Sequence, residues 1–210
     1  MLNFDYILNR MADPILRASL IDREIDQYGD FPYRDSVFEG ILKSFNGEPI
    51  RVFQVGAIES LETKFRLGSG WSELFWGEYI REYGGSLHVC DINLNHIAHS
   101  NFASSNLKYQ VNLHVGDAAE CLSKMFADDS EFVPFDIYYL DGADEPFGNQ
   151  QTLDQFKIIE DHKALVLVDD VPTKGQLLLE YLDKDPRDIP IKHYDVGNGM
   201  MAINLRNVNV

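Results

Sequence analysis

The sequence predicts a Rossmann-like, doubly wound α/β fold with a mainly parallel seven-stranded sheet, an antiparallel last strand and helices at the N-terminus. From residue 50 onward, segments typical of strands alternate with segments typical of helices. The strands are short, continuous apolar runs such as IYYL and LVLV, as expected for a parallel sheet buried on both faces. The last two strands are separated only by residues 195–199, which is too short for a helical crossover, so they should be antiparallel.

The individual elements follow from apolar spacing and turn residues. Helical spacing predicts helices over residues 3–28 and 36–45, joined by a turn-rich link, and Asn46-Gly47-Glu48-Pro49 ends the second. Strands are expected at 51–55, 87–90, 109–115, 135–140 and 164–168, with helices after them at 71–83, 94–104, 118–125, 152–161 and 174–182. The final strand pair spans 189–194 and 200–205.

Length and charge narrow the function. The 210 residues suit one domain, and a net charge of −16 without a basic cluster argues against nucleic acid as a partner. No apolar run approaches the roughly 20 residues of a membrane span, and no signal peptide is evident, so we expect a cytoplasmic protein without a membrane partner. Cys90 and Cys121 do not form a C-x-x-C pair and are expected to be buried.

Aspartates follow four successive strands. Parallel strands bring their carboxyl ends to one edge, where such sheets bind ligands, and the residues concerned are Asp91, Asp117, Asp141, Asp169 and Asp170. For any single aspartate, capping of the next helix is an equal alternative. The position of Asp91 suits ribose hydroxyls, and Asp117 could accept from an adenine amine. The last three form an oxygen trio that suits Mg²⁺, Mn²⁺ or Ca²⁺ rather than zinc.

A glycine lies directly at the end of the first strand. Gly56 stands where the backbone must approach a ligand closely, although use in a turn is an alternative explanation for a loop glycine. The loop that follows is long and contains Gly68-Ser69-Gly70 before the next helix. No G-x-G-x-x-G is present at the strand end, which disfavours a nicotinamide dinucleotide site.

These motifs together resemble the class I S-adenosylmethionine (SAM) dependent methyltransferases over residues 50–205. The segments that carry the resemblance are VFQVGAIES, CDIN, HVGDAAE, FDIYYLDGAD and ALVLVDDV. The resemblance implies a SAM-binding domain over 50–210, preceded by a helical cap or lid over 1–49. It implies cofactor binding by Gly56, Ala57, Gly70, Trp71, Asp91, Ile92, Asp117, Ala118 and Asp141.

Within that class, the chain resembles the metal-dependent O-methyltransferases of the macrocin and catechol types. The resemblance implies Mg²⁺ as an optional cofactor held by Asp141, Asp169 and Asp170. In those enzymes a divalent cation binds neighbouring substrate oxygens and lowers a hydroxyl's pKa, and the methyl group is transferred largely by positioning. The expected acceptor is a small hydroxylated molecule.

The sequence offers several candidates for the general base. The catechol type has a lysine three residues after its first metal aspartate, where this chain has Asp144. Asp141 and Asp144 are the catalytic candidates, and Glu145, His162 and Lys174 are further ones. Two other hypotheses stay open: a SAM-fold binding or assembly protein without chemistry, and, less favoured, a dehydrogenase. The acceptor and the oligomeric state, including a homo-oligomer, are not determined by the sequence.

Overall fold

The computed structural model describes residues 34–61, 72–128, 133–143, 146–196 and 198–206. The expected helix at 3–28, the link after it, and Gly70, Trp71, Asp144 and Glu145 lie outside these residues. Among the described residues, no helix combines the length and apolarity that a membrane crossing requires.

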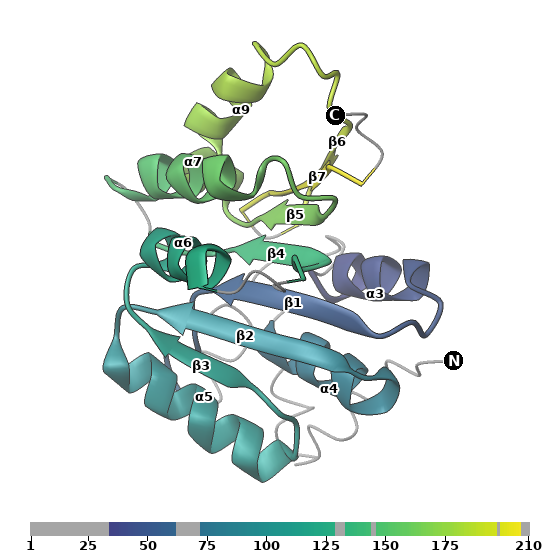
Figure 1. Cartoon of the computed structure of the whole chain (residues 1–210), viewed down its shortest axis with the longest axis vertical. Coiled ribbons are helices and arrows are strands. Elements are labelled where there is room, and N and C mark those ends of the chain that lie inside the picture. Colours follow the sequence, from purple (N-terminus) through teal and green to yellow (C-terminus); the bar gives the residue numbers. More distant parts are fainter. Residues whose placement is uncertain (1–33, 62–71, 129–132, 144–145, 197, 207–210) are drawn as a thin grey trace.

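A seven-stranded sheet in the order β3-β2-β1-β4-β5-β7-β6 forms the centre of the molecule (Figure 1). Its strands are β1 Ile50–Val55, β2 Gly85–Asp91, β3 Asn112–Val115, β4 Ile137–Leu140, β5 Leu165–Val168, β6 Ile191–Tyr194 and β7 Met200–Asn204. β1 to β5 are parallel, whereas β7 is antiparallel to both β5 and β6. The predicted fold class, including the antiparallel last strand, is confirmed.

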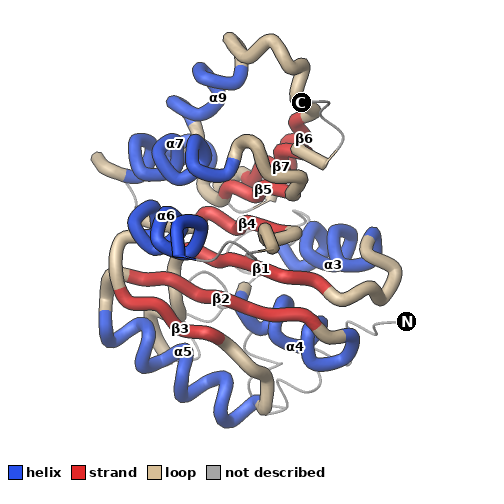
Figure 2. The backbone as a smooth tube through the Cα atoms, viewed as in Figure 1, coloured by secondary structure: helices blue, strands red, loops and turns tan. Residues whose placement is uncertain are grey.

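Helices cover both faces of the sheet (Figure 2). Each of the strands from β1 to β5 is followed by a helix. The helices are α3 Arg34–Ser44, α4 Glu73–Tyr83, α5 Leu94–Leu107, α6 Ala118–Asp128, α7 Gly148–Ile159, α8 Val171–Lys174 and α9 Gln176–Leu182. One core lies between the sheet and α3, α4 and α5, and the second lies between the sheet and α6, α7 and α9. β4 shows why: Tyr139 points into the first core and Tyr138 into the second, as alternation along a strand requires.

The last predicted helix is broken in two in the structure. It was expected at 174–182, but a short helix begins already at Val171, with Pro172 in its first turn, and a break at Gly175 separates it from α9. A side chain at Gly175 would lie 3.1 Å from the side chains of both Met201 and Val171, so the small residue lets this turn pack against β7. As a result Lys174 ends α8 instead of beginning a long helix.

The described part of the N-terminal segment packs directly on the sheet. Phe38 of α3 is buried, with its ring centroid 5.0 Å from that of Trp76 and 5.6 Å from that of Tyr139. Trp76 and Phe75 of α4 are buried core residues. Division of the chain at residue 49 stays a prediction, because residues 1–33 lie outside the described part.

Candidate functional site

The carboxyl ends of β1, β2 and β4 point to the same side of the molecule in Figure 1, and a pocket of about 430 Å³ opens there. Its walls come from the segments after β1 to β5. The predicted site residues that line it are Gly56, Ala57, Asp91, Ile92, Asp117, Ala118, Asp141 and Asp170. Residues that also line it include Glu59, Cys90, His96, Gln151, Gln155 and Lys174. Of the predicted cofactor-binding and metal-binding residues that are described, Asp169 alone is absent from the lining.

Gly56 is required by the close approach of two loops. Its φ of +89° lies in the region that favours glycine, and an added Cβ would lie 2.2 Å from the carbonyl oxygen of Asp141. β1 and β4 are neighbouring strands, so this approach brings the loop after β1 against the loop after β4. The close backbone approach expected from the sequence is therefore real, and its immediate partner is Asp141.

Asp91 ties the loop after β1 to the end of β2. Its Oδ2 accepts a hydrogen bond from the backbone N–H of Ala57 at 2.9 Å and lies 3.0 Å from Nδ1 of His96. Its Oδ1 accepts from the N–H of Asn93 at 2.7 Å. A carboxylate has about four lone-pair sites, so Asp91 shapes the pocket wall and still has acceptor capacity.

A series of buried hydrogen bonds also holds the loop after β1 in place. The N–H of Ile58 donates to Oγ of Ser100 at 3.0 Å, and that hydroxyl donates to Oε2 of Glu73 at 2.7 Å. The hydroxyl of Tyr109 donates to the other carboxylate oxygen. Burial raises the pKa of Glu73 to about 7, against the opposing effect of these hydrogen bonds. Nothing in the sequence pattern singles out this network, whose members lie in the loop after β1, on α4, on α5 and after α5.

The wall after β2 and β3 combines an apolar surface with a capped helix. Ile92 lines the pocket and is 77% exposed, so its side chain offers an uncovered apolar face. Asp117 Oδ1 accepts from the N–H of Glu120 at 3.0 Å. The capping alternative is thus correct for that atom, while Asp117 and Ala118 still line the pocket.

The predicted carboxylate trio is brought together. Asp141, Asp169 and Asp170 each place an oxygen within 4.8 Å of the others. Asp169 is fully buried, and both of its oxygens are engaged: Oδ2 accepts from the hydroxyl of Tyr139 at 2.8 Å, and Oδ1 accepts from the N–H of Asp170 at 3.0 Å. Asp169 therefore anchors the cluster from inside the protein, and Asp141 and Asp170 face the pocket.

Lys174 enters this cluster as its cation. Its Nζ lies 2.6 Å from Oδ1 of Asp141 and 3.2 Å from Oδ2 of Asp170, and its side chain is 4% exposed. Asp170 has a left-handed backbone, with φ 48° and ψ 51°, and its carbonyl accepts from the N–H of Lys174. The i,i+4 spacing of Asp170 and Lys174 was the available sequence signal, since such residues share a helix face. It was weak because the expected helix began only at Lys174, so Asp170 lay outside it.

The pocket fits SAM in its volume and in the backbone, polar and apolar surfaces that it offers. Its volume lies within the roughly 300–1,000 Å³ of small-molecule sites. Gly56 leaves the backbone uncovered, Asp91 offers a hydroxyl acceptor, and Ile92 offers an apolar face for a ring. The assignment of these residues to the cofactor stays a prediction.

A divalent cation does not fit the cluster as it is arranged. Mg²⁺ needs near-octahedral oxygen ligands at about 2.0–2.1 Å. Here the ammonium of Lys174 holds an oxygen of Asp141 and one of Asp170, and both oxygens of Asp169 accept hydrogen bonds. We therefore derive no chemical step through a metal.

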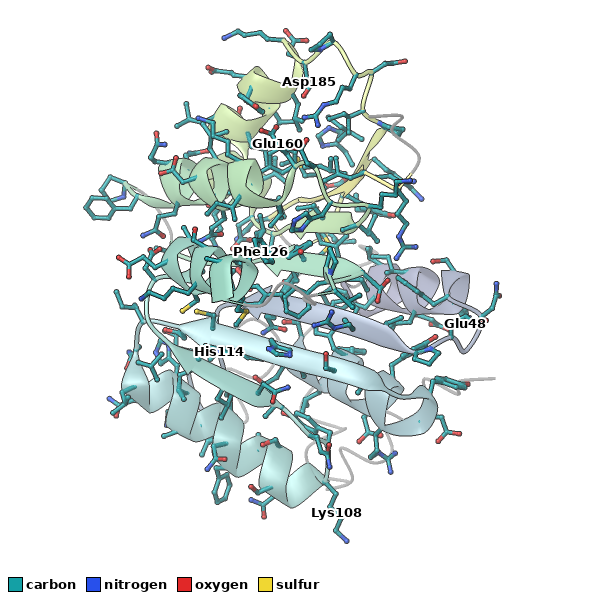
Figure 3. All side chains as sticks on the ribbon, in the orientation of Figure 1. Glu48, Lys108, His114, Phe126, Glu160 and Asp185 are labelled. Atoms are coloured by element: carbon teal, nitrogen blue, oxygen red, sulfur yellow. The ribbon has the colours of Figure 1, made fainter. Side chains whose placement is uncertain are left out.

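Two other sequence candidates have ordinary structural roles. Nδ1 of His162 lies 2.7 Å from the hydroxyl of Tyr138, and its ring packs edge-on against Phe126, which Figure 3 labels on α6. His162 does not line the pocket.

Cys90 is buried at the end of β2, as expected, and burial raises the pKa of its thiol. Cys121 is half-buried, because α6 leaves part of it at the surface; its expected full burial was wrong.

No protein-family model matches the chain, and no curated protein matches its sequence. Several solved structures match its fold. The methyltransferase PaMTH1 of Podospora anserina, solved with SAH (S-adenosylhomocysteine), has 17% identity and a TM-score of 0.58, with 97% of each chain covered. The O-methyltransferase TomG of Streptomyces achromogenes, involved in tomaymycin synthesis and solved with SAM, has 18% identity and a TM-score of 0.59, covering 91% of this chain and 89% of that one.

A third match is the MycE methyltransferase of the mycinamycin pathway, solved with Mg, SAH and mycinamycin VI. It has 15% identity and a TM-score of 0.58, with 95% of this chain and 57% of that chain covered. At these identities the likeness establishes the fold alone: the chain has the same Rossmann-like fold as these methyltransferases.

Proposed function

We propose that the chain transfers a methyl group from SAM to a hydroxyl oxygen of a small molecule. One observation carries the proposal: a single pocket joins a cofactor-like wall, formed by Gly56, Asp91 and Ile92, to a charged wall formed by Asp141 and Lys174. The solved structures of the same fold, two of them with SAH and one with SAM, support it.

The two walls have separate duties in this proposal. Gly56 and Ala57 leave space beside the backbone for the methionine part of SAM, Asp91 accepts from ribose hydroxyls, and Ile92 covers the adenine. The net charge of −16 favours a small molecule over a nucleic acid as acceptor. The pocket residues of the charged wall, Asp141 and Asp170, are positioned beside the acceptor hydroxyl.

The chemistry requires a proton acceptor and correct alignment. Bound SAM would supply an electrophilic methyl carbon: a C–O bond forms as the C–S bond breaks, giving a methyl ether and S-adenosylhomocysteine. The acceptor hydroxyl gives up its proton, and Asp141, a carboxylate on the pocket wall, passes it to water. Asp144 stays a second candidate for this role. Holding the oxygen in line with the methyl carbon accounts for most of the acceleration.

Calorimetric titration tests the cofactor half. We expect SAM and S-adenosylhomocysteine to bind, and Asp91→Asn to weaken both by about tenfold or more, since it removes a charged acceptor. The matched control is Asp183→Asn, an exposed aspartate that does not line the pocket. Absence of binding to the unaltered chain at millimolar ligand would refute the proposal.

Turnover separates the enzyme from a binding protein. A panel of phenols, catechols, sugars and hydroxy acids with radiolabelled SAM should yield a methylated product with at least one class. Binding of SAM with no product from any class would favour the binding or assembly protein instead.

A further inference from the structure

We propose that the ammonium group of Lys174 is the resident cation of the acceptor wall, in the place where a divalent ion would bind, so that methyl transfer proceeds without added metal. The catalytic part of this inference rests on the proposed function; the electrostatic part does not.

The position of the ammonium carries the first step. The two cluster carboxylates that line the pocket are Asp141 and Asp170, and Nζ of Lys174 lies 2.6 and 3.2 Å from their oxygens. These are charge-assisted hydrogen bonds with the geometry of ion pairs. A divalent ion shared by the same two carboxylates would stand beside a fixed positive charge, so the two cations exclude each other.

The cluster is also held in place on its inner side. Asp169, which would complete a three-carboxylate metal site, is fully buried and accepts hydrogen bonds at both oxygens, from Tyr139 and from the N–H of Asp170. Rotating the carboxylate away from these two donors would leave a buried donor unsatisfied, which is costly, so the orientation of Asp169 is fixed.

Lys174 is held in this position by its surroundings. It is 3% exposed, and its stem passes close to the start of α7, where a Cβ on Gly148 would lie 3.3 Å from Cγ of Lys174. The short helix α8 places it one turn after Asp170, whose left-handed backbone begins that helix. The burial of Lys174, its packing near Gly148 and the short helix α8 therefore all fix the position of its ammonium group.

A fixed ammonium can perform the electrostatic part of a cation's task. Lys174 lines the pocket beside Asp141, so an acceptor oxygen bound there meets a positive charge as its own negative charge develops. A preorganised charge of this kind stabilises the transition state without rearrangement. A lysine carries one charge where Mg²⁺ carries two, so this wall favours acceptors whose hydroxyl is already acidic, such as phenols.

The electrostatic part can be tested without any turnover. Binding of Mn²⁺ to the full chain is measured by calorimetry and by electron paramagnetic resonance. We expect no Mn²⁺ binding to this site in the unaltered chain or in Lys174→Arg, which keeps the charge. Lys174→Met removes the charge at similar length and should bind Mn²⁺ at least about tenfold more tightly than the unaltered chain. Adding Asp170→Asn to Lys174→Met should abolish the gain. Lys184→Met, an exposed lysine outside the pocket, is the control and should behave as the unaltered chain.

Tight Mn²⁺ binding by the unaltered chain that Asp170→Asn removes would overturn the inference. If Lys174→Met does not fold, the unaltered chain and Lys174→Arg still decide between the two outcomes. Where turnover is found, a chelator should leave it unchanged and Lys174→Met should lower it by about 100-fold, as for loss of an oxyanion donor. Loss of turnover with chelator would also overturn the inference. A chain that neither binds SAM nor turns over refutes the proposed function, and the Mn²⁺ titration still tests the site.

Discussion

The hydroxyl of Tyr139 donates a hydrogen bond of 2.8 Å to Oδ2 of Asp169, and both residues are at most 1% exposed. Tyr139 lies on β4 and Asp169 follows β5, the neighbouring parallel strand. The bond therefore holds the first aspartate after β5 inside the protein, and the next residue, Asp170, is the one that reaches the pocket. Asp169 is therefore the buried anchor of the acidic cluster, and Asp141 and Asp170 are the two members that face the pocket.

Tyr139→Phe tests the anchor. It leaves a fully buried carboxylate oxygen without its donor, so we expect the free energy of unfolding to fall by about 1–3 kcal/mol. Urea denaturation measures the change. Tyr83→Phe removes a hydroxyl from a half-buried tyrosine at the edge of the first core, and should change stability by less than about 0.5 kcal/mol. Equal effects of the two substitutions would contradict an anchoring role.

Gly56→Ala tests the approach of the two loops. The added methyl would lie 2.2 Å from the backbone oxygen of Asp141 at a φ of +89°, so the loop must move. We expect SAM binding to weaken by about tenfold or more, and stability to fall by at least 1 kcal/mol, roughly the cost of a left-handed non-glycine residue. Gly40→Ala is the matched control: a Cβ there has nothing within 4 Å, and alanine favours its helix. Tight SAM binding by Gly56→Ala would refute the placement of the cofactor.

Ile92→Ala tests the apolar wall. Ile92 is 77% exposed without ligand, so the substitution should scarcely change stability, yet it removes apolar surface that a bound adenine would cover. We expect the dissociation constant of SAM to rise by about three- to tenfold, from the roughly 1 kcal/mol that burial of such a surface contributes. Leu94→Ala is the control, because Leu94 is 67% exposed and does not line the pocket. The prediction fails if both variants bind SAM equally well.

Glu73→Gln tests the buried chain under the loop after β1. Burial raises the pKa of Glu73 from 4.5 to about 7, so the folded state binds its proton more tightly than the unfolded state. Stability from this group is complete below about pH 4.5 and is lost as pH rises through 7. Glutamine resembles the protonated acid, so Glu73→Gln should gain stability relative to the unaltered chain between pH 5 and 8. The gain should be about 3 kcal/mol at most, at 1.36 kcal/mol per pKa unit.

Denaturation curves of both proteins across that pH range measure the difference. The comparison isolates Glu73, because the other titrating groups are common to both proteins. A difference in stability that stays constant with pH would mean that Glu73 does not titrate in this range.

The sequence by itself determined the order of elements, the parallel sheet with its antiparallel last strand, and the edge on which Asp91, Asp117, Asp141 and Asp170 meet. These features depend on apolar periodicity and on the rule that parallel strands end on one side, both of which are local or topological.

Only the tertiary structure decided the role of each aspartate. Asp141 and Lys174 lie 33 residues apart and meet because α8 ends at Lys174, whose side chain passes close to Gly148 at the start of α7. Asp169 turns inward because Tyr139 donates its hydroxyl from the neighbouring strand β4. Which oxygen meets a ligand, an ammonium or a buried donor depends on side-chain positions a few ångströms apart, and hydrophobic patterning carries no information at that scale.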